Sequence, residues 1–349
     1  MPGDAETMPR GAAAGSRSVP GGPPDRAGEA DPEYQVGDTS RLCAKILSEL
    51  EQVIVGKREA VGLVLLGILA SGHILIEDLP GLGKTLLARS FARVLGLQFT
   101  RVQFTPDMLP ADLTGAVVLD PGTGDAVFRR GPVFTNLLLA DEVNRTPPKT
   151  QAALLEAMAE AQVSADGHTY PLAQPFVVLA TDNPIEYEGT YPLPEAQLDR
   201  FIARVRLGYL DHAGEAEMAR RRLARGSAPP QPGQVTDAAG LLGMRESLER
   251  VHLDADLLDY IVSLVAVTRT HPKASVGASP RGTLAVIQLA RGSAVLESRD
   301  YVTPEDVKAV AVPALAHRLV LRPEMWVRQV TGEDVIGEIL EAVPVPRAR

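Results

Sequence analysis

The sequence contains little cysteine and few aromatic side chains. Its 349 residues include one cysteine, Cys43, and only 4% are Phe, Trp or Tyr. A single thiol excludes an intrachain disulfide framework and any zinc or iron–sulfur site that needs several cysteines. We therefore expect a reducing, cytoplasmic setting, with Cys43 packed inside a helix. The scarcity of aromatics argues against a base-stacking platform for single-stranded nucleic acid.

Long hydrophobic runs and an excess of positive charge are also missing. The longest apolar run, residues 61–70, is too short to cross a bilayer. The N-terminus lacks the basic-then-apolar layout of a signal peptide, so we predict no membrane insertion. The formal net charge of −9 argues against a protein that coats nucleic acid or anionic membrane with its whole surface. The remaining composition is ordinary for a globular protein, and the length suits two domains.

Changes in composition divide the chain into four segments. Residues 1–36 are rich in Gly, Pro and Ala, cannot bury enough apolar surface, and are predicted to be a disordered tail. Residues 37–224 combine helical patterns with short apolar runs, which indicates an α/β core. Residues 225–238 turn to Pro and Gly, which indicates a linker. Residues 239–349 carry apolar residues at helical spacing, which predicts a small all-helical domain.

The expected core begins with helices and continues with buried strands. Asp38, Thr39 and Ser40 offer caps for a first helix. Short apolar strands are typical of a parallel sheet covered on both faces. They are expected at His73–Glu77, Gln98–Phe104, Asn136–Ala140 and Phe176–Ala180.

The segment from Leu79 to Thr85 has the composition of a phosphate-binding loop. It reads LPGLGKT, follows the first predicted strand and precedes a predicted helix. Glycines let backbone N–H groups converge on phosphates, Lys84 can reach the outer phosphates, and the hydroxyl of Thr85 can ligate magnesium. The usual pattern has a glycine where this chain has Asp78. The strand, loop and helix together predict a nucleotide site.

Two later strand ends carry polar groups suited to nucleotide hydrolysis. Asp141 and Glu142 follow an apolar strand. Asp141 is placed to hold Mg²⁺, and Glu142 is placed to orient or deprotonate the attacking water. Asn183 follows the next strand and can hold that water, although an Asn-Pro pair is also an ordinary turn former.

Two arginines are candidates for stabilising charge on the transferred phosphoryl group. Arg200 lies in PEAQLDRF, and Arg281 lies in GASPR at the start of a helix in the C-terminal segment. A guanidinium group stabilises negative charge on phosphoryl oxygens. An arginine alone is uninformative, so their motif context decides.

Taken in order, these motifs resemble the MoxR family of AAA+ ATPases, from about residue 38 to about residue 320. The resemblance implies an AAA+ P-loop NTPase core, a parallel sheet flanked by helices, followed by a helical lid domain. It departs from the family pattern at Asp78, and at Lys57 and Asp182, where glutamine is more usual. The segments that carry it are Ile54–Lys57, Glu77–Thr85, Gln103–Asp107, Asp112–Gly115, Gly131–Phe134, Leu139–Gln151, Glu188–Phe201, Gly277–Arg281 and Asp300–Asp306.

The resemblance implies roles for the residues singled out above, with ATP and Mg²⁺ as cofactors. Lys84 and Thr85 would be the Walker A residues, Asp141 and Glu142 the Walker B residues, Asn183 sensor 1, Arg281 sensor 2 and Arg200 the arginine finger. The nucleotide would also contact Val55, Gly56, Pro80, Gly81, Leu82, Gly83 and Leu86.

An arginine finger serves the neighbouring subunit, so the resemblance implies a homo-oligomer, expected to be a hexameric ring. It also implies a protein client and a partner protein with a von Willebrand factor A domain. Residues 107–127 would hold the helix-2 insert, and residues 162–176 would form a hairpin with Asp166-Gly167 at its turn.

Three functions remain open for such a ring. The first is a remodelling motor or chaperone that acts on a protein client or assists metal-cofactor insertion. The second is a nucleic-acid motor, which should carry Lys or Arg at the hairpin tip. Residues 164–169 contain neither and include an acid, which argues against nucleic acid as a partner. The third is a switch that hydrolyses ATP slowly; Glu142 argues against complete loss of hydrolysis.

Overall fold

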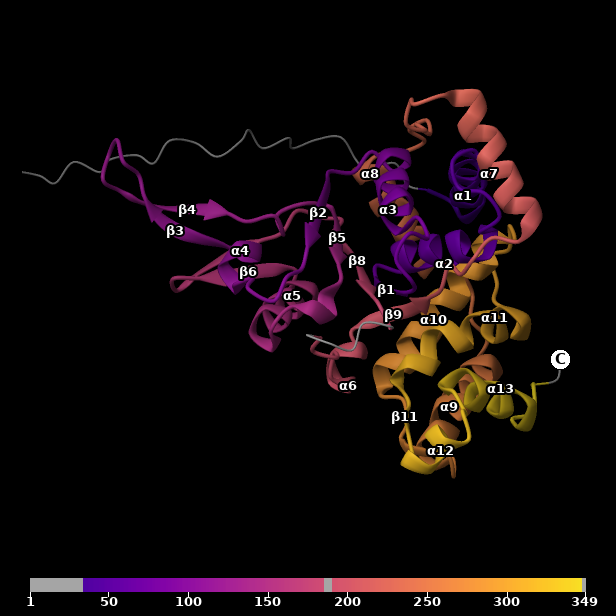
Figure 1. Ribbon diagram of the computed structural model, residues 1–349. Coiled ribbons are helices and arrows are strands. Elements are labelled where there is room, and N and C mark those ends of the chain that lie inside the picture. The colour runs from indigo at the N-terminus through magenta and orange to yellow at the C-terminus, as the bar shows by residue number, and fades with distance from the viewer. Residues whose placement is uncertain (1–33, 185–189, 347–349) are drawn as a thin grey trace, which may run out of the picture. The chain divides into compact units, whose positions relative to one another are not determined.

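The computed structural model describes residues 34–184 and 190–346 (Figure 1). The predicted tail, residues 1–36, lies almost entirely outside these ranges, as do Glu188 and Gly189 of one family motif. The first helix, α1 (Val36–Glu51), begins at Val36, and the carboxylate of Asp38 accepts a hydrogen bond from the N–H of Gln35.

The predicted caps of α1 were placed too late, because Thr39 and Ser40 have partners far away in the chain. Both side chains are buried inside α1. The hydroxyl of Thr39 lies 2.6 Å from that of Ser247, and the hydroxyl of Ser40 lies 2.7 Å from that of Ser298. Their polar side chains therefore serve long-range packing rather than capping.

A five-stranded parallel sheet forms the centre of the α/β core, with strand order β2-β5-β8-β1-β9 (Figure 1). The residues of β5 are all buried, and β1 and β8 are buried except at their last residues. This burial confirms, for these three strands, the expectation of apolar strands covered on both faces. The strand expected over Gln98–Phe104 differs, because β2 lies at the edge of the sheet and Val102 alone among its residues is buried. The strands are β1 (His73–Glu77), β2 (Phe99–Gln103), β5 (Leu137–Asp141), β8 (Val177–Asp182) and β9 (Phe201–Val205).

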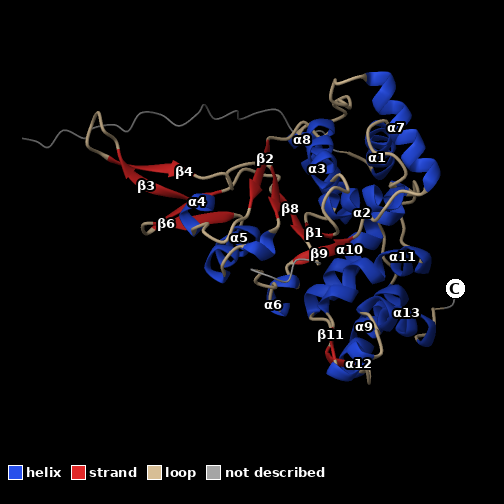
Figure 2. Cartoon of the chain, viewed as in Figure 1, coloured by secondary structure: helices blue, strands red, loops and turns tan. Residues whose placement is uncertain are grey.

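Helices lie on the two faces of this sheet (Figure 2). Ile74 and Ile76 pack in one apolar cluster with α1, α2 (Arg58–Leu69) and α3 (Lys84–Val94). Leu75 faces a second cluster that contains α5 (Pro148–Glu160). The period of two along β1 therefore directs neighbouring residues to opposite layers.

Two hairpins extend the core beyond the sheet. The first consists of α4 (Pro110–Thr114), β3 (Gly115–Leu119) and β4 (Ala126–Arg130), so the expected insert continues to Arg130. The second pairs β6 (Gln162–Ala165) with β7 (His168–Pro171). Asp166 and Gly167 form its turn with φ angles of 50° and 74°, which fits the predicted Asp-Gly hairpin. The rings of Phe128 and Tyr170 stack with their centroids 4.1 Å apart, and this contact joins the two hairpins.

The C-terminal region is helical, as predicted, but also contains a short antiparallel strand pair. Strand β10 (Ala274–Val276) pairs with β11 (Val320–Leu321). The sequence did not predict this pair because it joins two very short segments that are far apart in the chain. The helices of this region are α8 (Ala238–Glu249), α9 (Ala255–Thr270), α10 (Pro280–Leu296), α11 (Pro304–Leu315), α12 (Pro323–Val327) and α13 (Gly332–Ala342), with the 3₁₀ turn η2 (Ala316–Arg318). Earlier in the chain lie α6 (Glu195–Leu198), α7 (His212–Arg225) and the 3₁₀ turn η1 (Val143–Arg145).

One hydrophobic interior runs through the segments before and after the predicted linker. Side chains of α1, α2 and α3 share an apolar cluster with side chains of α8, α10 and α11. The predicted linker contacts α3 at two points: Arg93 Nε donates to the carbonyl oxygen of Pro232 at 2.9 Å, and the N–H of Val235 donates to the carbonyl oxygen of Val94 at 2.8 Å. Arg245 of α8 donates twice to the carbonyl oxygen of Ile68 near the end of α2. Residues on both sides of the linker therefore complete a common core.

Cys43 occupies a packed helical position, as predicted. Its side chain is fully buried in α1, and burial raises the pKa of the thiol to about 12. The thiol is therefore unreactive at neutral pH. Among the described residues, no helix combines the length and apolar character needed to cross a membrane.

Buried His73 gives the fold a predicted sensitivity to acid. The N–H of Val178 donates to His73 Nδ1, and His73 Nε2 lies 3.0 Å from the carbonyl oxygen of Met158. Burial lowers the pKa of His73 from 6.5 to about 4, so the folded protein keeps the ring neutral. Between pH 6.5 and about 4, the unfolded chain gains this proton and the folded protein does not. We expect the free energy of unfolding to fall by about 3 kcal/mol between pH 6.5 and pH 4 from this group.

Urea unfolding at a series of pH values would measure this effect. The variant His73→Gln should have a shallower slope over this range by about one proton, whereas His168→Gln, at the exposed start of β7, should keep the wild-type slope. An unchanged slope in His73→Gln would refute this assignment.

Candidate nucleotide-binding site

The phosphate loop lies between β1 and α3, as predicted. Gly81 and Gly83 have φ angles of 85° and 89°, a left-handed conformation that favours glycine. Gly83 directly precedes α3, so the N–H groups of the first turn of the helix open toward the loop. This local geometry suits an anion.

The ammonium group of Lys84 is buried among acidic groups. Its Nζ donates to the carbonyl oxygen of Asp78 at 2.6 Å. Burial lowers the pKa of Lys84, and the charges of Asp141, Asp78 and Glu142 oppose that shift. The predicted Walker B carboxylates are therefore close enough to act on the predicted Walker A lysine.

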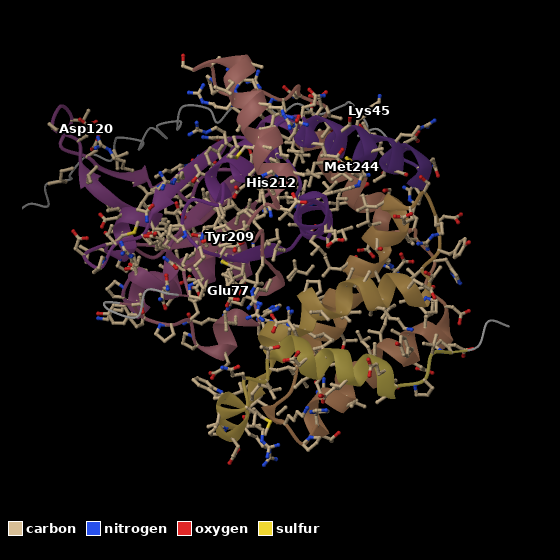
Figure 3. The ribbon with its side chains drawn as sticks, turned by 45° about the vertical axis from the view of Figure 1, so that its right-hand side comes forward. Lys45, Glu77, Asp120, Tyr209, His212 and Met244 are labelled. Atoms are coloured by element: carbon tan, nitrogen blue, oxygen red, sulfur yellow. The ribbon has the colours of Figure 1, made fainter. Side chains whose placement is uncertain are left out.

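Asp78 has a structural role that a glycine at this position could not perform. Its carboxylate accepts hydrogen bonds from the N–H groups of Leu207 and Gly208. These bonds attach the start of the phosphate loop to the segment that follows β9. Figure 3 labels Glu77, which precedes Asp78 in the chain, and Tyr209, which follows Gly208.

A cavity of about 320 Å³ lies beside the loop and suits a nucleobase. The predicted contacts Val55, Gly81, Leu82, Gly83 and Leu86 line it, together with Met218 and Leu210. Gly56 and Pro80 are not among its lining residues. Lys57 also lines the cavity, and its Nζ donates to the carbonyl oxygen of Tyr209 at 2.7 Å.

Strands β5 and β8 bring the predicted catalytic side chains together. Thr181 donates its hydroxyl hydrogen to Asp141 Oδ1 at 2.6 Å and accepts from the N–H of Glu142 at 2.8 Å. Glu142 has a φ angle of 58°, which is uncommon for a residue other than glycine. Asn183 is buried two residues after Thr181. This edge of the sheet therefore gathers Asp141, Glu142 and Asn183.

Two polar residues of β2 complete this arrangement, and sequence reasoning missed both. Arg101 donates Nε and Nη2 to Asp141 Oδ2 at 3.0 and 2.8 Å. Arg101 Nη2 also donates to Gln103 Oε1, and Gln103 Nε2 donates to Glu142 Oε2 at 2.6 Å. The signal available in the sequence was the two-residue spacing of Arg101 and Gln103, which places both polar side chains on one face of a strand expected to be apolar.

The oxygen donors at this point suit Mg²⁺. Asp141 supplies a carboxylate, and Thr85 supplies a hydroxyl from the first turn of α3. The guanidinium group of Arg101 lies against Asp141, so this carboxylate already accepts a cationic partner. Mg²⁺ in nucleotide sites uses few carboxylates and takes further oxygens from phosphates and water. Within the described ranges, no group of three or more His, Cys, Asp or Glu side chains could hold a metal alone.

The two predicted arginines meet in a different cavity, of about 420 Å³. Arg200 and Arg281 both line it, and none of its lining residues belongs to the cavity beside the phosphate loop. Asp199 explains their meeting, because it accepts hydrogen bonds from Ser279 at the start of α10 and from buried Arg318. Arg281, the expected sensor 2, therefore lies with Arg200 and not in the cavity beside the phosphate loop.

The geometry of the phosphate loop agrees with comparisons to known proteins. Residues 73–203 match the ATPase family associated with various cellular activities (AAA), and residues 266–339 match the AAA lid domain. The chain is 40% identical over 352 residues to "Chaperone MoxR1" of Mycobacterium tuberculosis, covering 96% of this chain and 92% of that protein. The chain belongs to the MoxR family of AAA+ ATPases. It is also 44% identical over 313 residues to the uncharacterized protein YeaC of Bacillus subtilis, covering 89% of this chain and 97% of YeaC.

A solved structure supports the same conclusion. A crystal structure of a proposed ATPase from Cytophaga hutchinsonii matches with a TM-score of 0.83 and 40% sequence identity. The match covers 88% of this chain and 96% of that one. The chain is therefore an ATPase with an AAA domain and an AAA lid.

Proposed function

We propose that this MoxR-type ATPase binds and hydrolyses Mg²⁺-ATP between the subunits of a ring, and uses the cycle to remodel a protein client. The ring is expected to be hexameric from the family resemblance. The observation that carries the proposal is the separation of two half-sites within one chain. The phosphate loop and the Walker B carboxylates form one half, while Arg200 and Arg281 line a separate cavity.

The first half-site would bind the nucleotide. Lys84 and the backbone N–H groups of the loop, residues 80–86, would hold the phosphates, and Val55 and Gly56 would lie near the adenine. Thr85 and Asp141 would hold Mg²⁺, which would neutralise charge on the phosphates.

The same half-site would also activate the attacking water. Glu142 is the proposed base, since its carboxylate follows β5 and is held by Gln103. Asn183, buried at the end of β8, would orient the water.

The second half-site would act on the neighbouring subunit. Arg281 is exposed, and Arg200 is partly exposed, with Nη1 donating to the carbonyl oxygen of Leu155. A guanidinium supplied from another subunit stabilises charge that develops on the phosphoryl group. A heterologous contact of this kind forms a ring when the rotation between successive subunits closes.

The exposed insert hairpin supports a protein client. Val118, Val127 and Leu119 are 38%, 48% and 72% exposed on β3 and β4. Exposed apolar side chains of this kind suit contact with apolar segments of a protein. We propose that the client binds here, with a von Willebrand factor A domain protein as partner and the cytoplasm as location. Metal-cofactor insertion would be one form of such client maturation.

Mixing two inactive variants tests the shared site. Arg200→Ala subunits keep an intact nucleotide site, and Lys84→Ala subunits keep an intact Arg200. Each variant alone should hydrolyse little ATP. In equimolar mixed rings about a quarter of the sites combine both intact halves, so activity should return to about a quarter of the wild-type rate.

The same mixing is repeated with Arg281→Ala. Arg220→Ala, which removes an exposed guanidinium paired with Glu217 on α7, serves as the matched control and should remain active alone. Analytical ultracentrifugation shows whether rings form in the mixtures. If rings form and activity does not return at any ratio of the two variants, the proposal is contradicted.

A further inference from the structure

Four charged side chains connect the strand before the phosphate loop with the last helix. Arg204 of β9 donates Nη1 to Glu77 Oε1 at 3.4 Å and Nη2 to Glu333 Oε1 at 2.6 Å. Arg206 donates Nε to Glu77 Oε2 at 2.9 Å, and its Nη1 lies 3.1 Å from Glu333 Oε1. Glu77 ends β1, and Glu333 lies in the first turn of α13. We call these four residues the Glu77–Glu333 network.

Three of the four side chains of the network are largely shielded from solvent. The side chains of Glu77 and Arg204 are each 17% exposed, and that of Glu333 is 29% exposed. Burial tends to raise the pKa of Glu333, but the charges of Arg204 and Arg206 hold that pKa below its usual value. Glu333 is therefore charged at neutral pH, and its attraction to Arg204 is screened less than that of a surface pair.

Asp182 brings the nucleotide site into contact with this network. It lies in register with Glu77 on the neighbouring strand and directly precedes Asn183. Among the described residues, its Oδ1 is buried and has no hydrogen-bond partner. Burial and the charge of Glu77 raise the pKa of Asp182, whereas the charges of Lys84 and Arg204 lower it. The positive charges of Lys84 and Arg204 therefore both stabilise the ionised form of Asp182.

We propose that Arg204 is a positioning residue that couples nucleotide at the phosphate loop to helix α13. It divides its charge between the carboxylates beside the loop and Glu333. This inference rests on the proposed nucleotide site. A bound triphosphate would engage Lys84 and add negative charge near Glu77 and Asp182. Arg204 would then be drawn toward the loop and away from Glu333, and the first turn of α13 would lose its anchor.

Hydrogen exchange of residues 332–342 in the full-length protein tests this coupling. A non-hydrolysable ATP analogue with Mg²⁺ should speed exchange of α13 about fivefold or more in the wild-type protein. In Glu333→Gln the anchor is already absent, so exchange should be fast with and without the analogue. Arg204→Gln leaves the sequence of α13 intact and should lose the same response.

A matched control lies on the same helix. Glu338 of α13 pairs with Lys273, on the segment leading into β10, away from the phosphate loop. Glu338→Gln should therefore retain the nucleotide-dependent change in exchange. Trp326, the only tryptophan, lies on α12 and is 76% exposed, so its fluorescence gives a second readout near α13.

Affinity distinguishes coupling from a purely structural role. Because the coupling is reciprocal, Glu333→Gln should bind the analogue about fivefold more tightly than the wild-type protein, by calorimetry. A structural defect would weaken binding instead. Wild-type protein that binds the analogue without a change at α13, or a response retained in Glu333→Gln, would overturn the inference. Absence of any nucleotide binding by the wild-type protein would instead overturn the proposed function, and this inference with it.

Discussion

Replacing Lys84 with alanine is expected to weaken ATP binding about 100-fold or more. The ammonium group is buried, donates to the carbonyl oxygen of Asp78 and lies within the field of Asp141 and Glu142. With ATP bound it would pair with phosphate, and truncating one partner of a buried charged pair costs about 2–5 kcal/mol. Isothermal titration calorimetry with ATP and Mg²⁺ measures the loss directly.

A second lysine provides the matched control for this experiment. Lys45 is exposed on α1, and Lys45→Ala removes the same charge from the chain without touching the loop (Figure 3). Its ATP affinity should equal that of the wild-type protein. If Lys84→Ala, still folded by circular dichroism, bound ATP normally, the loop would not be the phosphate site.

The variant Glu142→Gln is expected to bind ATP and to hydrolyse it about 100- to 10,000-fold more slowly than the wild-type protein, because an amide cannot serve as the general base. The substitution preserves shape, and the new side chain can still accept the hydrogen bond from Gln103. Steady-state phosphate release, paired with calorimetric ATP affinity, separates loss of chemistry from loss of binding.

Glu246, exposed on α8, gives the control Glu246→Gln, which should turn over at the wild-type rate. Wild-type turnover in Glu142→Gln would remove Glu142 from the mechanism. The same variant, held in its ATP-bound form, is also the reagent for capturing the client and partner proteins from cells.

The parts of the site that depend on neighbouring residues were predictable from the sequence. The phosphate loop is one example, because strand β1, the left-handed glycines and the start of α3 are consecutive. The Asp166-Gly167 hairpin is another. In both, local backbone chemistry decides the structure, and the sequence pattern expresses that chemistry directly.

The parts that depend on distant contacts were not predictable in this way. Arg200 and Arg281 meet because Asp199 contacts Ser279 and Arg318, which lie 80 and 119 residues further along the chain. Arg101 reaches Asp141 across 40 residues through the pairing of β2 with β5. No local sequence pattern predicts contacts between residues so far apart in the chain, so the sequence alone could not identify these pairs.

Strand β9 and the misplaced caps have the same explanation. The run from Phe201 to Val205 is short and interrupted by Arg204, and pairing with β1 makes it a strand. Thr39 and Ser40 are good capping residues by composition, but their buried partners Ser247 and Ser298 decide their role. Tertiary contacts override local preference at these positions.

The common interior has a consequence for how the chain is made. Thr39 meets Ser247 across 208 residues, and Ser40 meets Ser298 across 258 residues. During synthesis, the apolar face of α1 would emerge from the ribosome long before α8 and α10 exist to cover it. Part of the apolar surface of the nucleotide-binding half would therefore stay exposed to solvent, and prone to aggregation, until most of the protein had been translated. We therefore expect this apolar face to need protection from unwanted contacts during synthesis of the chain.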